Sequence, residues 1–187
     1  MIWGIFARHL ARVRAHRRRF ASAQNGVAAV EFALLIVPFL IIIFATIEVG
    51  VSFAARQVIS NATETVARKL QTGDIKGKAI SEERLRTELC QQMQFMVTQG
   101  CPNLSFSFGT YDGFAKVPTD GLLDQDGKLT TQGITEASGT STINQLNVVY
   151  AWPLLTNILY LVNSPHAAGG TMPLFATITW QNEPFPN

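Results

Sequence analysis

Near its N-terminus the chain carries one long apolar run, residues 27–51, with the sequence VAAVEFALLIVPFLIIIFATIEVGV. Its polar members are Glu31, Thr46 and Glu48, and nothing polar interrupts it from Phe32 to Ala45. At about 1.5 Å a residue, a helix over this run rises about 37 Å, which is enough to cross a bilayer. The run therefore predicts one transmembrane helix.

The residues before this run are strongly basic. Residues 1–20 hold six arginines and no acid, whereas the nine remaining Lys and Arg residues face all 13 acidic residues. Positive charge beside a membrane helix stays on the cytoplasmic side. We therefore expect a cytoplasmic leader over residues 1–26, a single pass through the inner membrane and an exported domain over residues 73–187. The acidic balance of that domain argues against nucleic-acid binding.

The helix is predicted to continue beyond the membrane. Apolar residues recur at spacings of three and four from Val51 through Ala55 and Val66 to Leu70, which is the pattern of a helix with one buried face. Gly73 then supplies a stop signal. We expect one helix over residues 27–72, with residues 27–51 in lipid and the rest on the exported domain.

The exported domain combines helical and strand patterns. Ser81 precedes an apolar stripe typical of a second helix over residues 81–99. Apolar residues alternate with other residues in three further segments, which predicts strands. These segments are 104–108, 146–152 and 174–180, and a long loop over 112–143, a short helix over 153–162 and a connection over 164–170 lie between them. The predicted class is α+β, with a roughly three-stranded antiparallel sheet.

Both cysteines, Cys90 and Cys101, follow the apolar run. Outside the inner membrane they can oxidise to a disulfide, and closing so short a loop stabilises a domain by roughly 2–3 kcal/mol. The alternative is a pair of buried free thiols. Export favours the disulfide.

The segment Gly26-Val27-Ala28-Ala29-Val30-Glu31-Phe32 stands where the basic leader meets the apolar run. A glycine resists helix formation and leaves its carbonyl unshielded, which suits a bond that a membrane protease cuts. Cleavage after Gly26 would give Val27 a free amine, and Glu31 lies one helical turn along, so the two can pair within one subunit or between neighbours. The alternative places Glu31 at the headgroup boundary beside the arginines.

These residues resemble a known family. The order of basic leader, Asn25-Gly26, residues 27–34, residues 37–40 and Glu48-Val49-Gly50 is similar to that of TadE-like minor pseudopilins of the tight-adherence (Flp) pilus. The similarity continues over residues 61–68 and returns at residues 180–185, whereas residues 73–170 match only loosely. Phe32 stands where the family often has tyrosine. The chain is too short for the larger members, which add a von Willebrand-type domain.

The resemblance implies a pilin-like fold and a prepilin peptidase that cuts after Gly26. It further implies a role in pilus initiation, assembly and adhesion, with the major pilin, other minor pseudopilins and the inner-membrane assembly platform as partners. Glu31 would be the acid that guides packing in the pilus, with Phe32 beside it. No cofactor and no small-molecule substrate are expected.

Two further residues of the apolar run have two interpretations each. Pro38 removes a backbone hydrogen bond and is expected to kink the helix, either to help packing in a filament or without function. Glu48 lies about 25 Å above Glu31 along a helix axis and is expected to mark the outer membrane interface, with a subunit contact as the alternative.

Other classes of protein fit less well. Ser52-Phe53-Ala54 resembles a signal-peptide cleavage site, but Glu48 and the length of the run oppose it. Arg17-Arg18-Arg19-Phe20 only loosely resembles a twin-arginine signal. His166 is the only histidine outside the leader, so neither a catalytic site nor a metal site is expected, and Asp124-Gln125-Asp126-Gly127 predicts a turn. An unprocessed, membrane-anchored accessory protein shares the same topology and stays open.

Overall fold

A computed structural model describes residues 24–75, 81–134, 141–154 and 170–184 of the chain. The chain divides into two compact units, Met1–Phe44 and Ala45–Asn187. Most of the predicted leader, most of the predicted helix over 153–162 and most of the connection over 164–170 lie outside the described residues. The structure therefore tests the long N-terminal helix and the main elements of the predicted α+β domain.

The long N-terminal helix is α2 (Gln24–Gln71), which begins three residues earlier than predicted and ends one residue earlier. Arg68 and Lys69 lie in its last turn, where positive charge is favourable to the helix dipole. The chain then turns through Gly73, whose φ of 78° is open to glycine at little cost. The backbone N–H of Ile75 donates to the carbonyl of Lys69 and completes this C-terminal cap.

The second helix, α3 (Glu82–Met93), is shorter than predicted. Its start is as expected, because the Ser81 hydroxyl accepts a hydrogen bond from the backbone N–H of Arg84 at 3.2 Å. Its end comes early, because the backbone N–H groups of Met96 and Val97 both donate to the carbonyl of Met93. This tight turn leaves residues 94–99 outside the helix, so the prediction of a helix to residue 99 was wrong.

The sheet has four strands in the order β2-β1-β3-β4. Its three long strands are β1 (Leu104–Tyr111), β3 (Ile143–Pro153) and β4 (Thr171–Gln181), and they are antiparallel, as predicted. The fourth, β2 (Gly133–Ile134), pairs parallel to β1 at Ser107 and Phe108 and makes the sheet mixed. The α+β class is confirmed.

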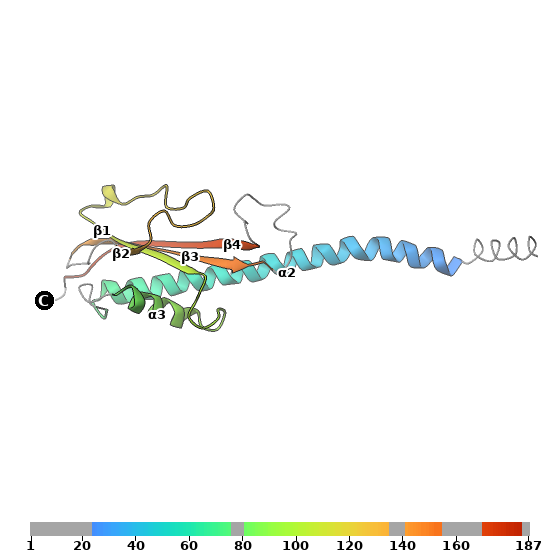
Figure 1. The fold of residues 1–187 in the computed structure, drawn as a ribbon, viewed down its shortest axis with the longest axis horizontal. Helices are drawn as coiled ribbons and strands as arrows, with labels where there is room; N and C mark the ends of the chain where they lie inside the picture. Colours follow the sequence, from blue (N-terminus) through green and yellow to red (C-terminus); the bar gives the residue numbers. More distant parts are fainter. Residues whose placement is uncertain (1–23, 76–80, 135–140, 155–169, 185–187) are drawn as a thin grey trace, which may run out of the picture. The chain divides into compact units, whose positions relative to one another are not determined.

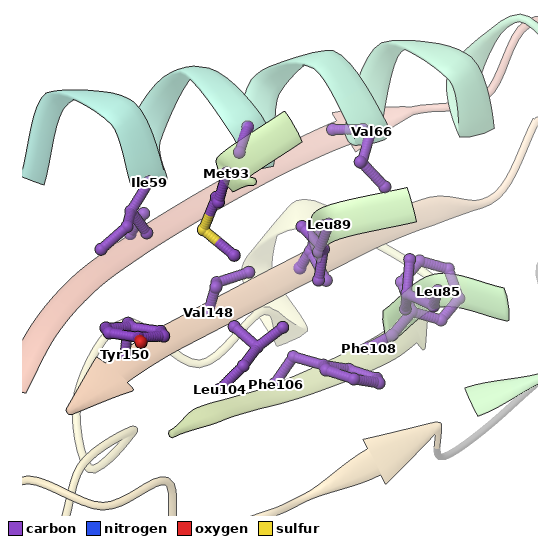
Figure 2. Packing of buried hydrophobic residues seen from close by; sticks show 14 of the residues in the cluster. Ile59, Val66, Leu85, Leu89, Met93, Leu104, Phe106, Phe108, Val148 and Tyr150 are labelled. Carbon is purple, nitrogen blue, oxygen red and sulfur yellow. The ribbon is translucent and has the colours of Figure 1, made fainter. Parts of the chain in front are cut away.

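The second unit buries one face of its sheet against two helices. The part of α2 from Ala45 onward and α3 lie on the same side of the sheet (Figure 1). Figure 2 shows Ile59 and Val66 of α2 meeting Leu89 of α3 above side chains of the sheet. Phe106, Val148 and Ala176 are register partners across β1, β3 and β4, and all three are buried. This apolar layer is the core of the second unit.

The connection between β1 and β3 covers the opposite face of the sheet. It includes the short 3-10 helix η2 (Phe114–Lys116) and β2. Its Leu129 is buried, and the carbonyl of Pro118 accepts a hydrogen bond from the Gln145 side chain at 3.0 Å. Because of this cover, β3 is buried on both faces from Ile143 to Tyr150, whereas its alternating pattern predicted a half-buried strand.

Candidate membrane and assembly segment

The apolar run forms the N-terminal half of α2 and has almost no cover within the chain. Val27 is 60% exposed, Phe32 65% and Leu35 71%. Among the described residues, α2 is one helix long and apolar enough to cross a membrane, with a mean hydropathy of 2.8 in its most apolar window. So much exposed apolar surface is unfavourable in water, because burying it gains roughly 25 cal/mol per Å². This segment therefore needs lipid or other apolar helices around it.

Gly26 lies in the first turns of α2, where nothing in the fold requires a glycine. A side-chain carbon built at Gly26 would have nothing within 4 Å. Glycine within a helix costs about 1 kcal/mol relative to alanine. Among the described residues, the fold therefore gives no packing reason for a glycine at this position.

Glu31 and Phe32 are exposed on the same segment. Glu31 has no ion-pair partner among the residues that the structure describes. The predicted pair with the amine of Val27 can form only after cleavage, so the uncleaved chain does not test it. Pro38 lies inside α2, as expected, and its side chain is exposed.

Glu48 is buried within the chain. It belongs to the second unit and is 3% exposed, and Ser52, one turn later, is 4% exposed. Its place at the outer membrane interface and its contact with a neighbouring subunit stay predictions. The signal was available in the sequence, since spacings of four and three lead from Glu48 through Ser52 and Ala55 to the buried Ile59.

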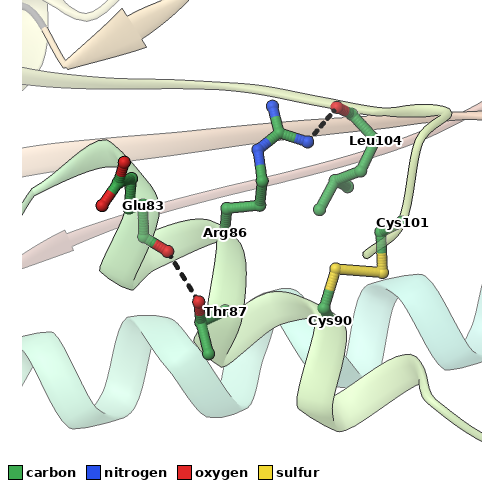
Figure 3. The surroundings of a disulfide bond; sticks show 6 residues. All are labelled: Glu83, Arg86, Thr87, Cys90, Cys101 and Leu104. Atoms are coloured by element: carbon green, nitrogen blue, oxygen red, sulfur yellow. Dashed lines mark hydrogen bonds between the residues drawn. A yellow bond between two sulfur atoms is a disulfide. The ribbon is translucent and has the colours of Figure 1, made fainter. Parts of the chain in front are cut away.

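Cys90 and Cys101 form the predicted disulfide, which joins α3 to the turn before β1 (Figure 3). Their Cα atoms are 5.9 Å apart. One turn before Cys90, the Arg86 guanidinium donates a hydrogen bond to the carbonyl of Leu104 at 3.0 Å and lies over the ring of Phe106. The disulfide and Arg86 together fasten α3 to the first residues of β1.

Three titratable groups of the second unit have shifted pKa values. Burial raises the pKa of Tyr111 and of Tyr150. A hydrogen bond and the charge of Lys116 lower the pKa of Asp112, which is exposed. Within the described ranges, no group of three or more His, Cys, Asp and Glu side chains is placed to hold a metal ion. These pKa shifts belong to separate structural contacts.

The Asp124 carboxylate is used in a turn, as the sequence predicted. Its Oδ1 accepts hydrogen bonds from the backbone N–H groups of Asp126 and Lys128, at 2.9 and 2.8 Å. Gly127 in this turn has a φ of 74°, and an added side-chain carbon there would lie 2.6 Å from the ring of Pro173. The turn thus needs glycine both for its backbone angle and for its close approach to β4.

Comparison with known families gives one match. Residues 26–68 match the family model described as TadE, TadE-like protein. The matched stretch begins at Gly26 and contains Glu31, Pro38, Glu48 and the whole apolar run. No curated protein and no solved structure matches the chain. Residues 26–68 are therefore similar to TadE-like proteins of the tight-adherence pilus system, and this similarity covers the long N-terminal helix alone.

Proposed function

We propose that this chain is a minor pseudopilin of a tight-adherence (Flp) pilus, cut by a prepilin peptidase after Gly26, which acts in pilus initiation and assembly and in adhesion. One observation carries the proposal. Gly26 stands at the start of a solvent-exposed apolar helix, where the fold has no packing use for a glycine. An unshielded carbonyl and a weak helix start are what a protease needs at a cut site.

The exposed apolar surface of this helix supports a role in which the subunit moves from the membrane into a pilus. Its side chains contact almost nothing within the chain, so lipid or the helices of neighbouring subunits can cover them equally well. Lipid tails and apolar helices are similar environments, and moving between them therefore changes the hydrophobic free energy little. A subunit that leaves the inner membrane for a pilus requires this property. The proposed partners are the major pilin, other minor pseudopilins and the inner-membrane assembly platform.

Glu31 is the exposed charged residue of the apolar run, since Glu48, the other acid in the run, is buried. An unpaired carboxylate in lipid costs several kcal/mol, and an ion pair with a cation removes much of that cost. Cleavage after Gly26 creates such a cation at Val27. The pair favours assembled subunits over isolated ones if the amine and the carboxylate belong to neighbouring chains.

The experiment is coexpression of the full chain with its cognate prepilin peptidase, followed by intact-mass spectrometry. The expected product begins at Val27. Gly26→Leu should block cleavage, because its side chain shields the carbonyl and strengthens the helix. Gly50→Leu is the matched control, since Gly50 also lies in α2 with open space around it, and it should be cut normally. A wild-type chain that stays intact would refute processing.

An unprocessed, membrane-anchored accessory protein of an envelope secretion or pilus machine is the alternative. It has the same helix, the same exported domain and the same family match, so the bond after Gly26 separates the two proposals. An intact chain that still copurifies with the assembly platform would favour the accessory protein. An exported enzyme is less favoured, because the described titratable groups form no reactive cluster.

A further inference from the structure

Strand β4 leaves one edge of the sheet open, and two hydrogen bonds show which backbone groups face outward. The backbone N–H of Asn182 donates to the carbonyl of Thr142, and that of Leu154 donates to the carbonyl of Gly170. In an antiparallel pair the bonded residues alternate, so even-numbered residues of β4 bond to β3. Odd-numbered residues therefore direct their N–H and C=O groups to the open edge.

The middle of this edge is unpaired. Phe175, Thr177 and Thr179 are the odd-numbered residues there, and among the described residues their outward backbone groups have no hydrogen-bond partner. The far end is closed, because Gln71 of α2 donates to the carbonyl of Gln181 and accepts from the backbone N–H of Glu183. The open stretch is therefore limited to the part of β4 before Gln181.

The opposite edge of the sheet is protected. β2 pairs with β1 at Ser107 and Phe108, and the Arg86 guanidinium donates a hydrogen bond to the carbonyl of Leu104. Proteins usually protect edges with charged residues, bulges or cover, because an open edge pairs with other chains. The sequence of β4, TMPLFATITWQ, contains no Asp, Glu, Lys or Arg, and its one protecting residue, Pro173, lies near its start. The stretch from Phe175 to Thr179 is therefore suited to accept a strand.

A groove runs along this edge between β4 and α2. One cavity, of about 390 Å³, is lined by residues 172–175 of β4 and by Val49, Ser52, Phe53 and Arg56 of α2. A second, of about 360 Å³, continues along residues 175–178 and along α2 from Arg56 to Glu64. Consecutive strand residues point to opposite faces, so a lining of consecutive residues places both cavities along the strand edge.

One polar atom in the groove lacks a partner. The Ser52 hydroxyl is buried, it lines the first cavity, and it makes no hydrogen bond. A buried hydroxyl without a hydrogen bond costs roughly 1–3 kcal/mol.

We infer that the open edge of β4 and its groove bind an extended, uncharged segment of another pilus subunit, which adds as a strand outside Phe175, Thr177 and Thr179. Backbone hydrogen bonds to these residues hold the segment, and an apolar side chain enters the cavity beside Phe53. The inference does not depend on cleavage after Gly26.

A second copy of this chain fits the edge poorly. β4 runs in the same direction as α2, since residues 172–175 lie beside residues 49–56 and Gln181 lies beside Gln71. Copies anchored in one membrane enter their exported domains at the same end, so their β4 strands cannot pair antiparallel. The other edge of a second copy is already protected by β2 and Arg86. Two β4 strands could pair only in parallel, which is less stable per residue than antiparallel pairing. We therefore expect the partner to be a different polypeptide.

The test is photocross-linking of the full chain in cells that carry the pilus genes. Benzoylphenylalanine replaces Phe175 in one variant and Thr179 in another, and mass spectrometry maps the contacted residues. An added strand gives contacts in one partner segment that shift by the separation of Phe175 and Thr179. The exposed Phe114 receives the same group and sets the background. Cross-links no stronger than this background, contacts without the shift, or contacts with β4 of a second copy would overturn the inference.

A matched pair of substitutions isolates the backbone bond. The Thr177 hydroxyl donates to the Asn147 side chain, and Thr177→Pro and Thr177→Val both remove that bond. Only proline also removes the outward N–H. Thr177→Val should keep the cross-link from position 175, whereas Thr177→Pro should lower its yield several-fold at an unchanged melting temperature. Equal yields from the two folded variants would contradict strand addition at Thr177.

Discussion

The Lys69 ammonium lies 2.8 Å from the Glu88 carboxylate, and this ion pair joins the last turn of α2 to the middle of α3. The two side chains are 36% and 21% exposed. A second ion pair, between Arg68 and Glu64, is longer at 3.7 Å, and its side chains are 74% and 61% exposed. The two pairs share one helix but differ in exposure, which makes them a natural comparison.

Glu88→Gln should lower the free energy of unfolding by about 1 kcal/mol, because it removes a half-buried charge pair between two helices. Glu64→Gln should change it by less than about 0.5 kcal/mol, since exposed pairs are screened by water. Urea unfolding of the full chain in mild detergent measures both, with the fluorescence of the buried Trp180 as the signal. Equal losses in the two variants would contradict a connecting role for Lys69 and Glu88.

Loss of the Cys90–Cys101 disulfide should destabilise the exported domain by about 3 kcal/mol, the value that the chain-entropy model gives for so short a loop. The Cys90→Ser/Cys101→Ser variant and the reduced wild type should unfold at the same urea concentration. Thiol titration of exported wild-type protein should find no free thiol before reduction. Two titratable thiols would show that the bond does not form in the cell.

The sequence predicted the elements whose patterns are local. Spacings of three and four along α2 and alternation along β1, β3 and β4 reflect side chains that must lie on one buried face. The end of α3 was missed, because its apolar stripe continues through Met96 although the backbone turns at Met93. An apolar stripe can continue beyond the end of its helix when the following turn packs against the same core.

The features that depend on distant contacts were not predictable from these patterns. The Gly- and Thr-rich segment 112–143 was expected to be a long loop, yet it covers a face of the sheet and includes β2. Asn147 in the middle of β3 was the residue that could have indicated this cover. It is buried and bonds to Ser107, Gln145 and Thr177. The open edge of β4 could not be predicted either, because the residues of one strand do not determine the order of the strands in the sheet.

Glu31→Gln should leave membrane insertion and cleavage after Gly26 unchanged but reduce incorporation of the chain into the pilus machinery. Glutamine keeps the shape of the side chain and removes its charge, so the proposed pair with the Val27 amine is lost while packing is kept. Glu64→Gln is the control, since it neutralises an exposed acid of the same helix outside the apolar run. Immunoblots of cell-bound and sheared-pilus fractions measure incorporation.

A further experiment distinguishes an ion pair within one subunit from an ion pair between neighbouring subunits. In a cleaved chain the Val27 amine and the Glu31 carboxylate lie one helical turn apart, so a pair within one subunit gains nothing from assembly. Only a pair between neighbours ties the carboxylate to incorporation. Coexpressed wild-type and Glu31→Gln chains should therefore incorporate the variant better than the variant alone, because wild-type neighbours still offer a carboxylate to its amine. Normal piliation in the Glu31→Gln strain would remove the pair between neighbours.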